Sequence, residues 1–220
     1  MKKSKIFISA FVMTAMMISC GGSRSGDTQQ TSSAREIKIG NQIWMSENLN
    51  VDKFRNGDPI RQAKTDEEWK TAVVKKQPAW CYYDNDNANG AKYGKLYNWY
   101  AVNDTRGLAP AGWHVPSDEE WTQLTDYLGG ESAAGTKMKS TSSWYKNGNG
   151  TNKSGFLGLP GGSRDSLGKF IPIGRAGLWW SSTENDTDKA WFRNLYYSSD
   201  DVYRSNTSKQ KGFSVRCLRD

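Results

Sequence analysis

Apolar residues recur every three or four positions in two stretches of the chain, which is the spacing of one helix face. In residues 65–76 (TDEEWKTAVVKK), Trp69 and Val73 fall on the same face. Thr65 and Glu68 have the spacing of a capping box, in which each residue satisfies a free backbone N–H of the first turn. The pattern predicts a short amphipathic helix that begins near Thr65.

The second stretch, SDEEWTQLTDYLGG at residues 117–130, repeats this arrangement. Ser117 and Glu120 again have capping-box spacing, and two glycines supply a stop. Asp118 and Glu119 lie in the first turn, where the helix dipole favours negative charge. The predicted apolar face consists of Trp121, Leu124 and Leu128. The pattern predicts a second short helix in which every carboxylate has a structural explanation.

Other segments alternate apolar and polar residues, or are short and aromatic, as strands are. EIKIGNQIWM (36–45) predicts a hairpin that turns at Gly40-Asn41. Three later segments predict further strands: GLWWSSTE (177–184), AWFRNLYY (190–197) and GFSVRCLRD (212–220). The last of these places Phe213, Val215 and Cys217 on the face expected to be buried. Because these segments are short and separated by turns, we expect an antiparallel sheet and the α+β class.

The first nineteen residues, MKKSKIFISAFVMTAMMIS, have the pattern of a secretory signal. Three lysines precede a mostly apolar run that is too short for a comfortable membrane span. The segment ends at SCG around Cys20, which resembles the lipobox of bacterial lipoproteins. We therefore expect a signal peptide over 1–19, lipidation at Cys20, and anchoring in the bacterial cell envelope, with the outer membrane favoured. An uncleaved anchor or an ordinary secretory signal is the alternative.

Residues 20–34 are small and polar and predict a flexible tether, so the folded domain is expected over 35–220. The chain of 220 residues carries 30 basic and 23 acidic side chains. Without the first nineteen residues, 27 basic side chains remain against 23 acidic ones, a net charge of +4. These charges are scattered, with no basic block that would follow a phosphate backbone. Nucleic acid is therefore excluded as a partner.

His114 is the only histidine of the chain, and it lies in GWHVPSDEEW (112–121) beside several acids. A metal site needs several imidazole or thiolate ligands, which this sequence does not supply. A Ser-His-Asp arrangement needs a nucleophile in an activating turn, and GxSxG is absent. We predict that His114 packs between aromatic rings or makes a local hydrogen bond. We also predict that the protein is not an enzyme and holds no metal or other cofactor.

The stretch DNDNANG (84–90) is the one candidate for a calcium loop. An EF-hand that starts at Asn85 lacks the Asp required at its first position, and Leu96 occupies its twelfth position in place of Glu. We therefore predict a turn rich in Asx residues. A calcium site of another kind is the alternative.

With Cys20 assigned to a lipid, Cys81 and Cys217 remain. An even number of cysteines in an oxidising compartment predicts a disulfide between them. Two buried thiols are the alternative.

Six blocks in fixed order carry a family resemblance: IKIGNQIWMSENL, CYYDNDNANGAKYGKLYNWYA, GWHVPSDEEWTQLTDYLGG, GFLGLPGGSRD, WWSSTE and GFSVRCLRD. Together they resemble the Fibrobacter succinogenes major paralogous domain (FISUMP) family from about residue 36 to the C-terminus. This family occurs in exported and lipid-anchored bacterial proteins, and its general molecular function is not established. Many members have a cysteine just before the P-x-GWH block, where this chain has Ala109. The resemblance thus leaves Cys81 and Cys217 as the intramolecular pair.

The family pattern is distantly similar to the C-type-lectin-like and formylglycine-generating-enzyme folds. This similarity implies a single mixed domain in which the N- and C-terminal strands come together. The chemistry of those folds does not carry over. The calcium-dependent sugar loop of the lectins has no counterpart, since STENDTD (182–188) offers Glu184 without the expected proline. The enzymes need a cysteine pair near the C-terminus, where this chain has only Cys217.

Residues 181–211 contain six Ser, three Tyr, three Asn and four Asp between the predicted strands. This composition is typical of binding loops, in which Tyr provides rigid contact area and Ser and Asn adapt their hydrogen bonds. We therefore hypothesise a binding module that presents this face to a glycan or a protein. The contact candidates are Trp179, Trp180, Glu184, Tyr196, Tyr197 and Tyr203. The alternatives are that the tryptophans belong to the core, that the protein is a structural or assembly protein of the envelope, or that the domain derives from an enzyme.

Overall fold

The computed structural model describes residues 35–220. The predicted signal peptide, the predicted lipidation site at Cys20 and the predicted tether lie outside this part of the chain. The described residues form five α-helices: α1 (Asp66–Val74), α2 (Asn87–Tyr93), α3 (Trp99–Val102), α4 (Asp118–Tyr127) and α5 (Glu131–Met138). Two short 3-10 turns cover Tyr83–Asn85 and Tyr145–Asn147.

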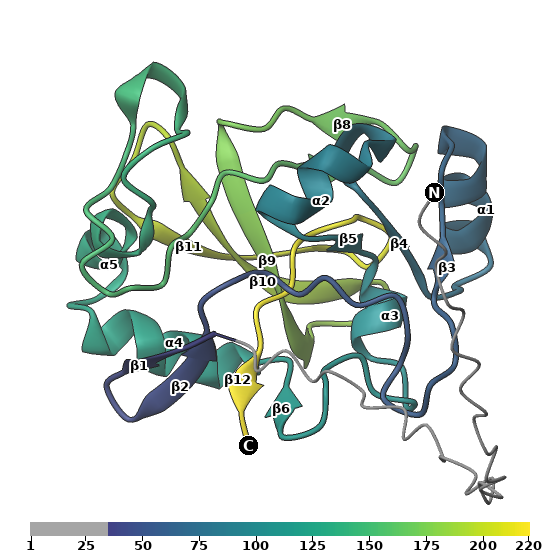
Figure 1. Ribbon diagram of the computed structural model, residues 1–220, viewed down its shortest axis with the longest axis horizontal. Coiled ribbons are helices and arrows are strands. Elements are labelled where there is room, and N and C mark those ends of the chain that lie inside the picture. Colours follow the sequence, from purple (N-terminus) through teal and green to yellow (C-terminus); the bar gives the residue numbers. More distant parts are fainter. Residues whose placement is uncertain (1–34) are drawn as a thin grey trace, which may run out of the picture. The chain divides into compact units, whose positions relative to one another are not determined.

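The strands are equally short, with the exception of three near the C-terminus (Figure 1). The first six are β1 (Glu36–Ile39), β2 (Gln42–Met45), β3 (Arg61–Gln62), β4 (Ala79–Cys81), β5 (Leu96–Tyr97) and β6 (Trp113–His114). The others are β7 (Ser163–Arg164), β8 (Phe170–Ile171), β9 (Ala176–Glu184), β10 (Lys189–Tyr196), β11 (Val202–Ser208) and β12 (Leu218–Arg219). Helices and mainly antiparallel strands are thus mixed, which confirms the predicted α+β class.

The two predicted helices are α1 and α4, and both begin at the residue that the capping pattern indicates. Ser117 and Glu120 form a complete capping box at the start of α4. Three further short helices, α2, α3 and α5, are also present. These three have seven, four and eight residues, which is too short for a visible apolar period.

The N- and C-terminal strands meet in one sheet of order β1-β2-β12-β6, as expected (Figure 1). Leu218 of β12 pairs with Trp44 of β2 on one side and with His114 of β6 on the other. The sheet β3-β4-β5 departs from the antiparallel expectation, since β3 and β4 are parallel. Parallel strands need a crossover connection, and here α1 lies in the connection between β3 and β4.

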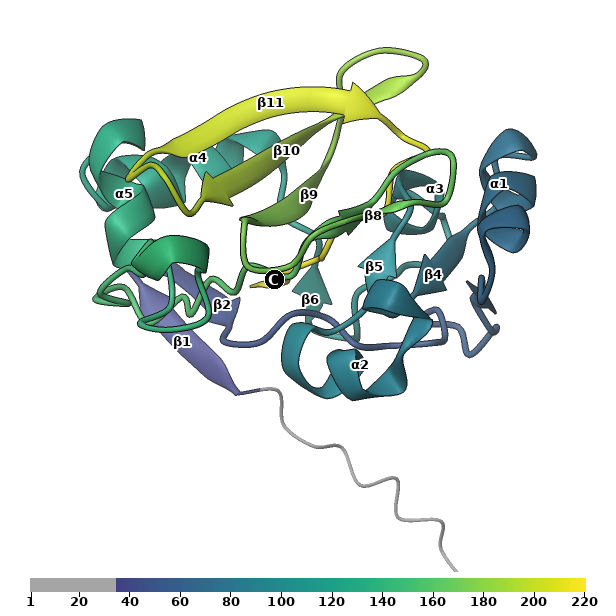
Figure 2. The same cartoon turned by 90° about the horizontal axis from the view of Figure 1, so that it is seen from above.

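The three longest strands form the antiparallel sheet β11-β10-β9 (Figure 2). Most residues of β9 and β10 are buried on both faces of this sheet. Successive side chains of a strand point to opposite faces. Trp179 accordingly packs with Trp121 and Leu195 in the cluster that includes α4 and α5. Trp180 packs on the other side with Phe192 in a second cluster. The unbroken apolar run of β9 follows from this double burial.

The C-terminal segment predicted as one strand over 212–220 is mostly threaded through the core. Residues 212–218 are all buried, yet only Leu218–Arg219 belongs to a sheet. Phe213 and Ser214 instead form single bridges with Tyr97 and Trp179. Phe213, Val215 and Cys217 are buried as predicted, but Ser214 and Arg216 of the other face are buried as well. The predicted strand was too long, because the partners of this segment change from residue to residue.

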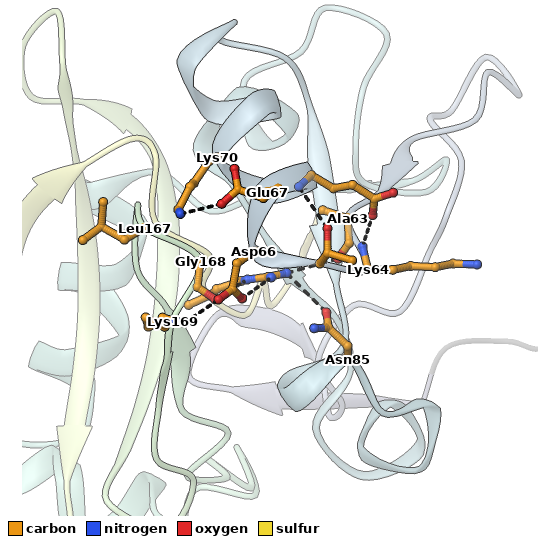
Figure 3. A network of polar contacts seen from close by, with 12 residues as sticks. Ala63, Lys64, Asp66, Glu67, Lys70, Asn85, Leu167, Gly168 and Lys169 are labelled. Carbon is orange, nitrogen blue, oxygen red and sulfur yellow. Dashed lines mark hydrogen bonds and ion pairs between the residues drawn. The ribbon is translucent and has the colours of Figure 1, made fainter.

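The buried Arg164 joins the start of α1 to the β7-β8 hairpin, and its partners Ala63, Asp66 and Gly168 are labelled in Figure 3. The Arg164 guanidinium lies 3.3 Å from Asp66 Oδ1 and donates to the backbone carbonyls of Ala63 and Gly168. The Asp66 carboxylate also accepts from Lys169 Nζ at 2.6 Å, and this contact lowers the pKa of Asp66. The network fixes the hairpin against the start of α1.

Candidate functional site

An open depression of about 590 Å³ lies beside the first turns of α4. We call it the His114 depression. Four separate parts of the chain supply its polar lining, which consists of Arg55, His114, Ser117, Glu119, Glu120, Gln123 and Ser182. Val102, Leu108 and Val115 supply apolar lining. A hollow with an apolar lining and a few convergent polar groups is the usual form of a small-ligand site.

The backbone around Pro116 brings these parts together. The carbonyl of Pro116 accepts a hydrogen bond from the Ser182 N–H at 2.9 Å, which places the end of β9 beside the helix start. The capping box then sets the direction of α4, so that Glu119 and Gln123, four residues apart, occupy the same side of the helix. Arg55 donates to the carbonyls of Ala109 and Trp113 and holds the facing loop.

His114 lies between two carboxylates. Its Nδ1 is 2.8 Å from Asp220 Oδ1, and its Nε2 is 2.9 Å from Glu120 Oε1. Burial opposes the charged imidazole, but the hydrogen bonds to Asp220 and Glu120 outweigh it and raise the pKa of His114. The prediction that His114 makes a local hydrogen bond is confirmed for Glu120, whereas Asp220 is 106 residues distant in sequence.

This arrangement determines what His114 can do chemically. Both ring nitrogens face acceptor oxygens, so both act as donors when the imidazolium forms. A ring whose two N–H groups are both engaged has no free lone pair to accept a proton from a substrate. Glu120 is engaged as well, because its other oxygen accepts from the Ser117 N–H at 2.7 Å. The pair therefore shapes the wall of the depression.

Four other polar side chains of the lining remain available to a ligand. Within residues 35–220, the side chains of Glu119, Gln123 and Ser182 make no hydrogen bond to the protein, and neither does Arg55 Nη1. These groups comprise a carboxylate, an amide, a hydroxyl and part of a guanidinium. Donors and acceptors are thus both offered, and the charges of Arg55 and Glu119 balance.

Asp118, the remaining acid in the first turn of α4, does not line the depression and belongs to an ion-pair cluster. Its carboxylate lies 2.5 Å from Nη1 of the buried Arg193 and 2.8 Å from Nη2 of Arg204. Burial raises the pKa of Asp118, but the two arginines more than offset this and lower it. Arg204 also stacks over the Trp191 ring at 3.6 Å. Asp118 therefore ties α4 to β10 and β11.

Two of the predicted ligand contacts belong to the core. Trp179 and Trp180 are 1% and 0% exposed. Their indole N–H groups donate inside the protein, to Asn48 Oδ1 and to the Tyr97 carbonyl, both at 2.9 Å. Neither side chain is accessible to a ligand, so the contact assignment was wrong for both and the core alternative holds. Both side chains are buried because other parts of the chain cover both faces of β9.

The other predicted contacts are accessible to different degrees. Tyr196 and Tyr203 are exposed and their rings lie 5.5 Å apart, while Tyr197 is half-buried against Tyr145. The exposed Glu184 pairs with Lys209. Residues 181–211 are not one set of loops, because they contain β10 and β11. The strand β11 has no apolar alternation of its own, and its pairing with β10 is what makes it a strand.

Cys81 and Cys217 are free, so the predicted disulfide is not present. Cys81 lies in the cluster with Trp69, whereas Cys217 lies in another with Tyr97. An even number of cysteines gives no information on whether the side chains approach each other, and here two separate clusters hold them. Burial raises the pKa of Cys81 to about 11 and that of Cys217 to about 12, so both are protonated thiols.

The stretch 84–90 folds into a 3-10 turn followed by the start of α2, for which Asp86 is the N-cap. In residues 35–220, no three His, Cys, Asp or Glu side chains are grouped as a metal site would require. No helix of this part of the chain is both long and apolar enough to span a bilayer.

Comparisons with known proteins identify the family of this chain but assign no activity to it. Neither a curated protein nor a solved structure matches the chain. The distant similarity to C-type-lectin-like folds accordingly stays a prediction. The model of the Fibrobacter succinogenes major domain matches residues 37–219. With the match extending over nearly all of the described residues, the chain belongs to the Fibrobacter succinogenes major domain family.

Proposed function

We propose that this protein is a lipid-anchored binding module of the bacterial cell envelope, without catalytic turnover, and that the His114 depression binds a glycan. The observation that carries the proposal is the convergence of four unengaged polar groups, on Arg55, Glu119, Gln123 and Ser182, in one open hollow. Sugar hydroxyls both donate and accept hydrogen bonds, so they suit a lining that offers both. The balanced charge of the lining favours a neutral ligand over an ion.

The contact surface proposed here differs from the tyrosine face suggested by composition. Tyr196 pairs with Ala176, at the opposite end of β9 from Ser182. Six residues of strand separate these ends by about 20 Å. The exposed pair Tyr196 and Tyr203 is the alternative contact surface, suited to a protein ligand because its two rings are exposed together.

A glycan array followed by calorimetry on the purified protein tests the proposal. The double variant Glu119→Ala, Gln123→Ala is expected to weaken binding about tenfold, since it removes two hydrogen-bonding groups worth about 0.5–1.5 kcal/mol each. The matched control Tyr196→Ala, Tyr203→Ala should bind as the wild type does. The reverse result would place the ligand on the tyrosine pair and contradict the assignment to the depression.

Absence of binding to any glycan would favour the alternative of an assembly protein, for which native mass spectrometry is the measurement. The envelope location rests on the sequence motif at Cys20. A Cys20→Ser variant expressed in a Gram-negative host should lose the detergent-phase partitioning of the wild type.

A further inference from the structure

Arg216 is a buried cation without a carboxylate partner. It is 1% exposed, and no carboxylate of residues 35–220 lies within ion-pair distance of it. Other buried cations of the domain are compensated: Arg164 by Asp66, Arg193 by Asp118, Lys139 by Asp200 and Lys209 by Glu184. Buried Lys95 has no such partner either. Both cations lie over aromatic rings, with Lys95 Nζ 4.2 Å from the centre of the Trp80 ring and Arg216 Cζ 4.4 Å from that of the Phe156 ring. A buried charge left uncompensated is costly.

The hydrogen bonds of Arg216 all go to neutral oxygens. Nη1 donates to the carbonyls of Met45 at 3.1 Å and Phe156 at 2.5 Å. Nε and Nη2 both donate to Asn48 Oδ1, at 3.1 and 2.8 Å. A guanidinium has five N–H groups, so within the described chain one N–H of Nη2 has no acceptor. Burial lowers the pKa of Arg216 to about 9, and the side chain is therefore still charged at neutral pH.

A small cavity lies directly against this guanidinium. It has a volume of about 140 Å³, and its polar lining includes Asn48, Asn50, Lys92 and Arg216. At about 30 Å³ per water, the space equals four to five water molecules, which is enough for a carboxylate or phosphate group. Lys92 adds a second positive charge. Glu47 also lines the cavity, but its side chain is 70% exposed and lies 3.9 Å from Arg35.

We propose that this cavity is a binding site for a small oxyanion of the carboxylate or phosphate class, held by the free N–H of Arg216 and by the charge of Lys92. The site is separate from the His114 depression, with which it shares no lining residue. Within the described chain, Glu47 acts on the charge of Arg216 only from beyond ion-pair distance, and the anion would supply a negative charge in direct contact with the guanidinium.

The test uses the whole protein, labelled with ¹⁵N, and titrates it with inorganic phosphate or acetate at constant ionic strength held by chloride. Replacement of Arg216 itself threatens the fold, so the informative variant is Asn50→Asp, which adds a fixed carboxylate to the cavity lining. Asn41→Asp is the matched control, because it makes the same change in the exposed turn between β1 and β2. The Arg216 Nε–H signal and the amide signals of Gly90 and Gly94 are monitored.

The expected result is a saturable shift of these signals in the wild type and in Asn41→Asp, and its loss in Asn50→Asp. Saturation should also raise the melting temperature by about 2–4 °C in the first two proteins only. A response to phosphate alone, to acetate alone or to both supports the site and defines its anion class. Shifts that never saturate, or that are equal in all three proteins, would show that only water fills the cavity and would overturn the proposal.

Discussion

At the scale of single residues, His114 shows how one side chain joins distant parts of the chain. It links β6 to the start of α4 through Glu120 and to the end of the chain through Asp220. The sequence places Glu120 within reach, because it lies six residues away. Nothing local indicates Asp220, which is brought there by the pairing of Leu218 with His114.

The charge on His114 makes the stability of the fold depend on pH. Because its folded-state pKa is raised above the ordinary 6.5, protonated His114 stabilises the fold fully below pH 6.5, and this contribution is lost as the pH rises through the folded-state pKa. At the acid end, the lowered pKa of Glu120 keeps its carboxylate charged below pH 4.5.

We therefore expect His114→Gln to cost about 0.5 kcal/mol more at pH 6 than at pH 9, the scale of a partly exposed ion pair. Urea unfolding of wild type and variant at both pH values measures the difference. An equal cost at pH 6 and pH 9 would show that the charge of His114 contributes nothing.

The two buried thiols give a second prediction for single residues. Their raised pKa and burial should keep Cys81 and Cys217 unreactive in the native protein at pH 8. After denaturation without a reductant, a thiol reagent should titrate both. Recovery of neither thiol under these conditions would demonstrate a disulfide.

At the scale of elements, α4 is the helix on which the fold and the proposed site both depend. Its capping box fixes where it begins, its apolar face packs on β9, and its acids serve separate purposes. Asp118 compensates two arginines, Glu120 holds His114, and Glu119 stays free for a ligand. These three acids are adjacent in the sequence, yet their roles differ because the fold places different neighbours beside each of them.

Asp118→Ala is expected to destabilise the protein by about 3 kcal/mol, because it leaves the buried charge of Arg193 without its partner. Chemical denaturation followed by tryptophan fluorescence measures this. The matched control is Asp126→Ala, which removes an exposed acid from the last turn of the same helix, where the dipole disfavours it. That variant should be neutral or slightly stabilised, and an equal loss in both would refute the role given to Asp118.

At the scale of the whole molecule, the two ends of the described chain pair with each other in one sheet. The strand β12 lies between the N-terminal hairpin and β6, so the last residues complete a sheet that the first residues begin. The side chain of Leu218 is buried in the cluster with Trp44 and Trp121. Unfolding is expected to be cooperative as a result.

Leu218→Ala should lower the free energy of unfolding by about 2–4 kcal/mol, the usual cost of a cavity in a packed core. Leu167→Ala is the control, because Leu167 is exposed in the β7-β8 turn and should change stability by less than about 0.5 kcal/mol. Guanidinium unfolding of both variants provides the comparison. A similar small effect in each would show that the closing strand contributes little.

The sequence by itself determined the features that depend on neighbours a few residues apart. The caps at Thr65 and Ser117, the turn at Gly40-Asn41 and the burial of Cys217 could all be predicted, because capping, turn geometry and alternation act within one element. The ordered blocks likewise sufficed to indicate the family.

The tertiary structure alone decided which of these features face solvent, the core or one another. Trp179 and Trp180 looked like surface aromatics until β9 proved to be covered on both sides, and Cys81 and Cys217 looked like a pair until separate clusters held them. Arg55, Ser182 and the start of α4 meet in one hollow although more than 60 residues separate neighbouring members of the set. The physical reason is that packing and charge compensation act between side chains in space, at separations along the chain that no local pattern encodes.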